Sequence, residues 1–346
     1  MGLMTAVMKE SAAPGVTVRQ AAIPAPGPEE FLARVDTAGI CGSDLHVYEW
    51  IPEYRFLEPH LPTILGHEIT ATVAEVADGA RVRIGDRVAI RPSITCGECD
   101  WCQRGQPQRC PTRVRLGYER PGGLADYLVA PIGNAYLLPA TADVEAASLM
   151  EPLTVVVHAL RGVRLRPGSI AAVIGAGAIG LLATELLAAR RPAELACIGI
   201  PADQAGGGLA LAQALGARGL VTGSGEVDRM RGTCDVVVVA AGAPQAMRLA
   251  AELAARGGLI TVAGLGIGPA ELDVDQLVRR EITISGSFGN TPQDWLDARD
   301  AIAIGTVKGA GVVSHVAAFA DAEHAFDLLV RHAARKVCLT PNGKLP

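Results

Sequence analysis

The sequence predicts an α/β protein built from two kinds of domain. Residues up to about 150 are rich in glycine, proline and short β-type runs, which are typical of a β-rich, barrel-like domain. After Pro152, apolar strand candidates alternate with helical runs, and this alternation is typical of a doubly wound parallel sheet. From about Asn290 the helices and strands no longer extend this repeat, so we expect the chain to return to the first domain.

The strands expected in the first part are short and are separated by turn signals such as Ala25-Pro26-Gly27-Pro28. These strands are Thr17–Arg19, Phe31–Thr37, Ile69–Val76 and Arg87–Ile90.

The second part opens with a continuous apolar strand, Ile170–Ile174, followed by glycines and a helical run from Ile179 to Arg190. The helices expected after it include Leu209–Leu215 and Pro244–Arg256. The further strand candidates are Leu195–Ile200, Gly219–Thr222, Asp235–Ala240 and Leu259–Ala263.

Composition and charge exclude several classes of protein. The chain has 346 residues, of which 49% are hydrophobic and 19% charged, so it is not disordered. Its net charge of −5 argues against nucleic acid as the main partner. Lys9 and Pro14 interrupt the first residues, which therefore lack the pattern of an export signal. The most apolar stretch, Ile170–Ala189, contains glycines and Glu185, which favour a buried β-turn-α unit over a membrane span. We expect a cytoplasmic protein.

Four cysteines lie within fifteen residues in the pattern C-G-E-C-D-W-C-x7-C. They are Cys96, Cys99, Cys102 and Cys110. Four thiolates can hold Zn²⁺ in a closed tetrahedron without an open position, so we expect a structural zinc. The eight cysteines of the chain could instead form four disulfides, but that pattern suits small secreted domains. The cysteines in apolar segments, which we expect in the core, are Cys197, Cys234 and Cys338.

A G-x-G-x-x-G motif stands directly after the strand Ile170–Ile174 and opens a helix, as dinucleotide binding requires. Gly175 permits the tight turn, Gly177 lets a pyrophosphate approach the backbone, and Gly180 allows close packing of helix on strand. Ala178 and Ile179 lie in the first helical turn, whose free N–H groups favour phosphate.

The residue expected to bind the adenosine ribose is Asp203, the only carboxylate near the end of the second strand. Glycines 206–208 follow it, and no arginine or lysine that could hold a 2′-phosphate is nearby. We therefore expect NAD rather than NADP. Asp203 could equally be a solvated turn residue.

A second donor set is spread over three segments. Cys41, His67, Glu68 and Glu151 offer thiolate, imidazole and carboxylate, which can hold zinc and leave a position for substrate. Taken singly, a cysteine in a turn and a histidine after glycine are more often structural.

With these motifs, the whole chain resembles the zinc-dependent medium-chain alcohol dehydrogenase family. The matching motifs are G-I-C-G-S-D-L-H (39–46), G-H-E (66–68), G-D-R-V (85–88), the four-cysteine loop, E-P-L (151–153) and G-A-G-A-I-G (175–180). The resemblance implies a GroES-like catalytic domain (1–153) with a structural-zinc lobe (about 92–115), a Rossmann NAD-binding domain (154–290), and a C-terminal segment (291–346) that rejoins the catalytic domain. It also implies a homodimer or homotetramer.

By this resemblance Cys41 and His67 are ligands of a catalytic zinc, and Glu68 is a nearby ligand that exchanges with water or substrate. Glu151 stands where sorbitol- and threonine-dehydrogenase-like members carry a carboxylate at or beside the metal. Ethanol-type members carry a cysteine there, so the polyol-like branch is favoured.

Ser43 can pass the proton of the alcohol toward His46, because an imidazole can carry protons, although His46 could be a mere surface residue. Asp44 is expected to fix the Cys41 loop through backbone hydrogen bonds. The resemblance places nicotinamide contacts near Leu265 and Phe288, for which apolar strand ends are the alternative.

The sequence thus predicts an NAD-dependent zinc oxidoreductase that converts a secondary alcohol (polyol, sugar, cyclitol or amino alcohol) into a ketone. The run His46–Trp50 is similar to L-threonine 3-dehydrogenases, but residues 51–58 depart from them. L-threonine and simple secondary alcohols therefore stay as alternative substrates. A zinc-stabilised binding protein and a zinc-ribbon nucleic-acid binder are less favoured, because every expected ligand and relay residue is present and the chain is acidic.

Overall fold

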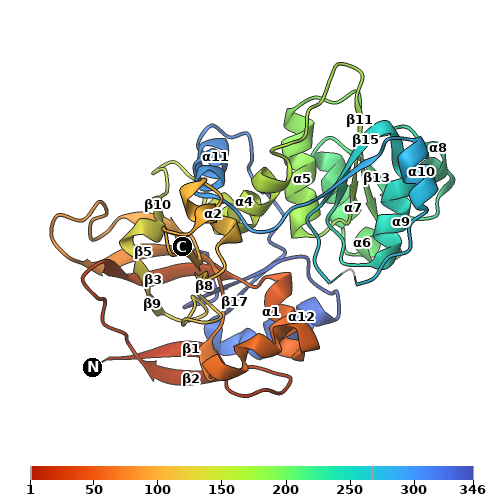
Figure 1. Cartoon of the computed structure of the whole chain (residues 1–346). Coiled ribbons are helices and arrows are strands. Elements are labelled where there is room, and N and C mark those ends of the chain that lie inside the picture. The colour runs from red at the N-terminus through yellow and green to blue at the C-terminus, as the bar shows by residue number, and fades with distance from the viewer. Residues whose placement is uncertain (1, 267, 346) are drawn as a thin grey trace. The chain divides into compact units, whose positions relative to one another are not determined.

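The computed structural model describes residues 2–266 and 268–345. The chain forms two compact units, which are described separately (Figure 1). The first unit contains Met1–Glu151 and Thr291–Pro346, and the second contains Pro152–Asn290.

The first unit is built on mainly antiparallel sheets, with one parallel pair formed by residues 315–318 and 337–340. Its largest sheet has seven strands in the order β10-β6-β5-β3-β18-β17, with β9 also paired to β3. These strands are β3 (Glu30–Gly39), β5 (Glu68–Val76), β6 (Arg87–Ile90), β9 (Tyr127–Pro131), β10 (Ala135–Leu137), β17 (His315–Ala318) and β18 (Val337–Thr340). A smaller sheet has the order β2-β1-β4, with β1 (Leu3–Lys9), β2 (Thr17–Ala22) and β4 (Thr63–Ile64).

The core of this unit joins the two ends of the chain. Phe31 of β3 lies in one buried cluster with Phe319 and Phe326, which come from the C-terminal segment. The same segment supplies β18, which pairs with β3 so that Cys338 lies opposite Gly39. Residues after 290 are therefore part of the β-rich unit.

The helices of the first unit are short. They are α1 (Gly42–Glu49), η1 (Pro52–His60), α2 (Asp100–Gln103), η2 (Pro107–Arg109), η3 (Ile132–Asn134), α3 (Val144–Ser148), α11 (Pro292–Ala303), η4 (Phe319–Asp321) and α12 (Ala322–Val330).

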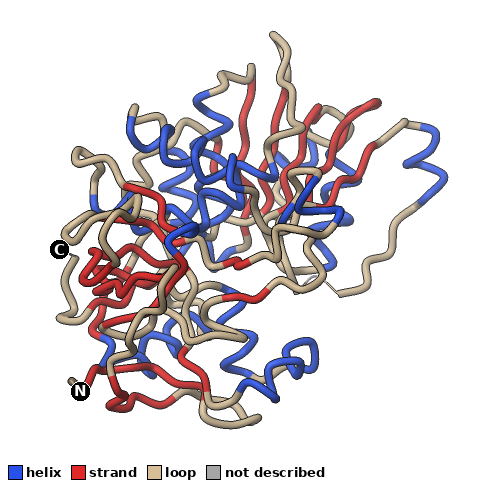
Figure 2. Tube along the Cα trace, turned by 60° about the vertical axis from the view of Figure 1, so that its left-hand side comes forward, coloured by secondary structure: helices blue, strands red, loops and turns tan. Residues whose placement is uncertain are grey.

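The second unit contains a six-stranded sheet whose strands all run parallel in the order β13-β12-β11-β14-β15-β16. Figure 2 draws strands in red and helices in blue. The strands of this sheet are β11 (Ile170–Ile174), β12 (Glu194–Gly199), β13 (Arg218–Val221), β14 (Cys234–Val239), β15 (Ala254–Val262) and β16 (Thr283–Gly286). In sequence order this is the 3-2-1-4-5-6 arrangement of a Rossmann sheet, with its switch point between β11 and β14. Ligands bind such sheets at the carboxyl ends of the strands beside that point.

Helices connect the parallel strands, as the right-handed crossover of parallel strands requires. They are α5 (Ala178–Ala189), α6 (Pro201–Ala205), α7 (Gly208–Ala214), α8 (Gly225–Arg229), α9 (Pro244–Leu253) and α10 (Val274–Arg279). A further helix, α4 (Met150–Ala159), precedes the first strand of this sheet. The expected end of the helix at Arg256 is wrong. The helix ends at Leu253, and residues 254–256 already belong to β15, because Ala254 adopts an extended backbone conformation (ψ of 135°) and pairs with Cys234 of β14.

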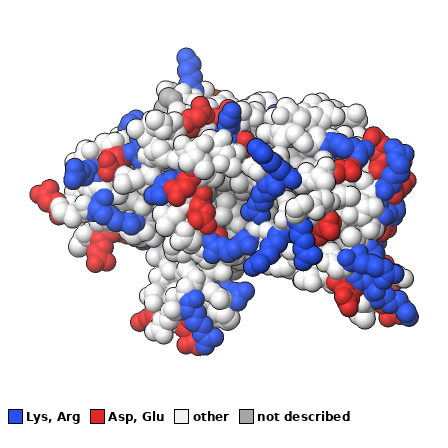
Figure 3. All heavy atoms as spheres, turned by 90° about the horizontal axis from the view of Figure 1, so that it is seen from above, with Lys and Arg blue, Asp and Glu red and all other residues white. Residues whose placement is uncertain are grey.

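Lys and Arg side chains are interspersed with Asp and Glu side chains on the face seen in Figure 3, and neither sign covers it. Within the described residues, no helix is both long enough and apolar enough to cross a membrane.

Candidate metal centres and cofactor site

The four-cysteine loop forms a lobe whose two ends are held together by a short pair of strands. β7 (Ser93–Ile94) and β8 (Val114–Arg115) pair antiparallel and bring the two ends of the loop together. Between them, α2 carries Cys102 and η2 ends at Cys110. The positive φ of Gly97 (78°) turns the chain between the first two cysteines.

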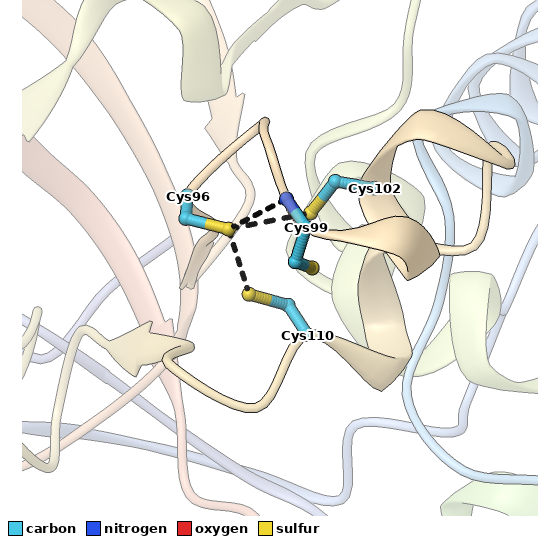
Figure 4. A group of neighbouring side chains, drawn as sticks. All are labelled: Cys96, Cys99, Cys102 and Cys110. Atoms are coloured by element: carbon cyan, nitrogen blue, oxygen red, sulfur yellow. Dashed lines mark hydrogen bonds between the residues drawn. The ribbon is translucent and has the colours of Figure 1, made fainter.

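The four sulfur atoms point toward one another (Figure 4) and all lie within 4.8 Å of one another. Cys96 Sγ is 4.0 Å from Cys102 Sγ and 3.5 Å from Cys110 Sγ. A tetrahedral zinc with bonds of about 2.3 Å holds its sulfurs about 3.8 Å apart, so the loop fits this ion. All four residues are free thiols.

Backbone groups prepare one of these thiols for metal binding. The N–H groups of Cys99 and Glu98 lower the pKa of Cys96 to about 6. Burial and the neighbouring thiols raise the pKa of Cys102 to about 11. The thiolate is the form of cysteine that binds a metal, so Cys96 is prepared to act as a ligand.

A second donor set lies in the first unit. Cys41 is the N-cap of α1, while His67 and Glu68 stand at the start of β5. One ligand atom from each of these three residues lies within 4.8 Å of the others. The register explains the approach, because Gly39, two residues before Cys41, pairs with Glu68. A thiolate, an imidazole and a carboxylate fit a zinc that keeps a position open for substrate.

Asp44 orients two of these donors. Its Oδ2 accepts a hydrogen bond of 2.9 Å from the Cys41 N–H, which closes the capping box of α1. Its Oδ1 lies 3.4 Å from Nδ1 of His67. The ring is therefore held with Nε2 turned to Ser43, whose Oγ is 3.5 Å away. A carboxylate behind a metal-binding histidine fixes the tautomer and orientation of its ring. The expectation that Asp44 secures the Cys41 loop is confirmed, and its contact with His67 adds a second role.

The same carboxylate governs the charge of the imidazole. Burial alone would lower the pKa of His67, but Asp44 and the Cys41 thiol raise it well above its ordinary value. The protein without metal therefore stabilises a positive charge at the point where a cation would bind.

Glu68 has a partner that the sequence did not reveal. Its Oε2 forms a buried ion pair with Nζ of Lys336, just before β18. Lys336 also donates a 3.0 Å hydrogen bond to the carbonyl oxygen of Ile40. Gly39 makes room for the pair, because a Cβ at this position would overlap Glu68 Oε2. Only the pairing of β18 with β3 brings this lysine to the site.

The other expected residues of this site lie around the donor set. Ser43 and His46 are one turn apart on α1, so their side chains emerge on the same face. Glu151 is buried near the start of α4 and is not part of the 4.8 Å group. The ring of His46 lies 5.7 Å from that of Tyr54.

The glycine motif has the geometry that the sequence suggests. Gly175 has a φ of 107°, and a Cβ there would meet the Ala241 N–H at 2.9 Å. A Cβ on Gly180 would overlap the carbonyl oxygen of Gly175. A Cβ on Gly177, the N-cap of α5, would meet nothing within 4 Å. The first and third glycines are thus required by packing, while the second faces the open space that a pyrophosphate needs. Ala178 and Ile179 form the first turn of α5.

The remaining cofactor candidates follow the carboxyl ends of three strands of the parallel sheet. Asp203 lies in α6 after β12, and its Oδ2 accepts a 2.9 Å hydrogen bond from the Ile200 N–H. Its carboxylate stands over Gly199, the last residue of β12. Leu265 follows β15 and Phe288 follows β16, and both side chains are about half exposed.

Comparison with known proteins identifies both halves of the chain. Residues 27–140 match the alcohol dehydrogenase GroES-like domain, and residues 178–304 match the zinc-binding dehydrogenase domain. An L-threonine 3-dehydrogenase of Bacillus velezensis is 31% identical over 350 residues, which cover 98% of this chain and 99% of the relative. A protein described as a probable D-xylulose reductase from Arthroderma otae is 30% identical over 315 residues, covering 86% of each chain.

Solved structures extend the likeness to the whole fold. A zinc-binding dehydrogenase of Sinorhizobium meliloti, solved with NADP, has a TM-score of 0.88 and 28% identity over 99% of this chain and all of its own. An alcohol dehydrogenase of Escherichia coli, solved with NADH, has a TM-score of 0.86 and 26% identity over 98% of this chain and all of its own. The chain belongs to the zinc-dependent medium-chain alcohol dehydrogenase family, in its threonine and polyol branch.

Proposed function

We propose that this protein is a zinc-dependent dehydrogenase that oxidises a secondary alcohol to a ketone with a nicotinamide cofactor. The observation that carries the proposal is the convergence of Cys41, His67 and Glu68, three different donor types within 4.8 Å of one another, in a chain with a complete dinucleotide motif. The substrate class we favour is a polyol, sugar, cyclitol or amino alcohol.

Hydride loss from an alcohol requires that its hydroxyl first lose a proton. When bound at Cys41, His67 and Glu68, zinc supplies a Lewis acid that lowers the pKa of the alcohol. Ser43 Oγ, beside His67 Nε2, accepts the proton, and His46 on the same face of α1 passes it toward solvent. A nicotinamide cofactor held at the glycine motif of Gly175, Gly177 and Gly180 would supply the hydride acceptor that turns the carbinol into a carbonyl. Asp44 keeps Cys41 and His67 in place throughout.

We also propose a second, structural zinc at Cys96, Cys99, Cys102 and Cys110. The spacing of the sulfur atoms supports it, and four thiolates close the coordination sphere. Glu151 remains a candidate for a carboxylate at or beside the catalytic metal.

For the cofactor we propose NAD in preference to NADP. The support is Asp203, whose carboxylate is held over the end of β12, and the absence of basic residues from 200 to 217. A carboxylate there binds the 2′-hydroxyl of NAD and repels the 2′-phosphate of NADP. Relatives of this fold have been solved with NADP and with NADH, so the preference needs a direct test. The ratio of kcat/KM for NAD⁺ and NADP⁺ should favour NAD⁺ and fall in Asp203→Ala.

The oligomer that we propose is a homodimer or a homotetramer of a cytoplasmic protein. All four residues of the edge strand β16 are exposed, and the exposed apolar side chains Val274, Val278 and Phe288 lie on neighbouring segments. An edge strand has one side without a hydrogen-bonded neighbour, so a strand of a second chain can pair with it there.

A substrate screen with absorbance of the reduced cofactor as readout tests the proposed function. Polyols, cyclitols, L-threonine and simple secondary alcohols form the panel, because an L-threonine 3-dehydrogenase is among the relatives. Cys41→Ala should abolish turnover while leaving the protein folded. The control is Cys197→Ala, which removes a buried cysteine of the second unit, outside the donor set. Full activity in Cys41→Ala would contradict the assignment.

A further inference from the structure

A group of aromatic rings lies against the donor set in the first unit. The ring of Tyr118 is 5.3 Å from that of His67 and 6.2 Å from that of Tyr54. Tyr54 in turn lies between His46, at 5.7 Å, and Phe56, at 5.8 Å. One wall of the candidate metal site is therefore made of rings, two of which carry a phenol hydroxyl.

Arg115 packs against two rings of this group. Its guanidinium lies 4.8 Å from the ring centres of both Tyr118 and Phe56. Glu119 holds the guanidinium with hydrogen bonds to Nε (3.1 Å) and Nη2 (2.5 Å). Glu119 therefore restrains the guanidinium that packs against the Tyr118 ring.

The hydroxyl of Tyr118 is the feature that this packing does not explain. The residue is only 5% exposed, and no described residue makes a hydrogen bond of standard geometry with Oη. The ring of Tyr118 packs on His67, whose Nε2 lies 3.5 Å from Ser43 Oγ. Tyr118 is therefore a neighbour of the histidine and the serine beside which the alcohol is expected. A buried hydroxyl without a partner is costly, so its retention points to a partner that arrives with the substrate.

Two of these rings offer a hydrogen-bond donor. A phenol O–H can donate a hydrogen bond, so Tyr118 and Tyr54 can each donate to a substrate oxygen.

We propose that the Tyr118 hydroxyl recognises a second oxygen atom of the substrate, on the carbon next to the reacting carbinol. This inference rests on the proposed dehydrogenase function and narrows its substrate to alcohols with a neighbouring hydroxyl. Ser43 serves the reacting oxygen, and Tyr118, beside Ser43, donates to the neighbouring one. A monoalcohol leaves the buried phenol without a partner, and a site built to hydrogen-bond a substrate hydroxyl rejects the analogue that lacks it.

The test compares butane-2,3-diol with butan-2-ol in the wild-type protein and in Tyr118→Phe. We expect the variant to lower kcat/KM for the diol about 10- to 100-fold and to leave that for the monoalcohol within about 3-fold. The matched control is Tyr136→Phe, whose ring stacks on Trp295 at 5.0 Å, away from this wall, and which should change neither value. Equal losses for both alcohols would show that Tyr118 only packs the site, and no loss for either would also overturn the inference.

A second readout does not depend on turnover. Titration of each alcohol into the Co²⁺-substituted protein, followed by its visible spectrum, gives the two dissociation constants directly. The wild type should bind the diol at least about 10-fold more tightly than the monoalcohol, and Tyr118→Phe should lose this difference. Equal affinities in the wild type would refute the inference even if the variant failed to fold. A wild-type protein that shows the preference in binding but oxidises no alcohol would instead refute the proposed function.

Discussion

Replacing Lys336 with methionine should be among the most damaging single changes to the first unit. Lys336 is 3% exposed, pairs with the buried carboxylate of Glu68 and also donates to the Ile40 carbonyl. Methionine fills a similar volume but leaves Glu68 as an uncompensated buried charge. Breaking a buried pair in this way costs about 3–5 kcal/mol. For a unit of this size each kcal/mol lowers Tm by roughly 2–4 °C, so a decrease of about 6–20 °C is expected.

Urea unfolding of four proteins in the presence of a chelator isolates this pair: wild type, Lys336→Met, Glu68→Gln and the double variant. If the two charges are coupled, the double variant should lose at least about 1–2 kcal/mol less than the sum of the single losses. Lys344→Met, at an exposed position of the same segment, is the control and should change stability by less than about 0.5 kcal/mol. A loss below about 1 kcal/mol in Lys336→Met, or additive losses in the cycle, would refute the reasoning.

Three further predictions concern the glycine motif, the cysteine lobe and the ring wall. Gly180→Ala should lower stability by about 1–3 kcal/mol, because its Cβ overlaps Gly175 O, whereas Gly177→Ala should keep normal stability and lose cofactor affinity. Thermal unfolding and cofactor titration separate these two, and equal stability losses would contradict the assigned roles. Cys102→Ser should reduce zinc content and thermal stability first, with activity falling only as a consequence; a fully stable, inactive variant would argue otherwise. Burial would raise the pKa of Glu119, but Arg115 lowers this pKa below the ordinary value of 4.5. The pair therefore stabilises the fold above about pH 4.5, and this contribution is lost as the pH falls through the folded-state pKa. Glu119→Gln should remove that part of the acid sensitivity of unfolding, and an unchanged pH profile would count against it.

Local sequence signals were sufficient for much of the fold. The runs Arg87–Ile90 and Ile170–Ile174 coincide with β6 and β11, because each is a short apolar segment bounded by turn residues. The third and first glycines of the motif are needed for packing, as their spacing suggested. The end of α9 was mispredicted because its helical pattern continues to residue 256, whereas the extended conformation of Ala254 and its pairing with Cys234 set the real boundary.

The residues that complete the site could not be found in this way. Lys336 reaches Glu68 only because β18 pairs with β3 at Gly39, and β3 pairs with β5 at the same residue. Tyr118 follows the cysteine lobe in sequence, and only tertiary packing brings its ring to 5.3 Å from that of His67. Neither residue belongs to a sequence motif. Strand register and packing place each of them at the site, and their neighbours in sequence do not indicate this.

The zinc content of purified wild type and Cys41→Ala tests the central claim most directly. Two separate donor sets predict about two zinc ions per chain in the wild type and about one in the variant, which keeps its four-cysteine lobe. Loss of one ion together with all alcohol oxidation would support Cys41, His67 and Glu68 as the catalytic centre. A variant that retains both ions, or a wild type with zinc in the cysteine lobe alone, would contradict it.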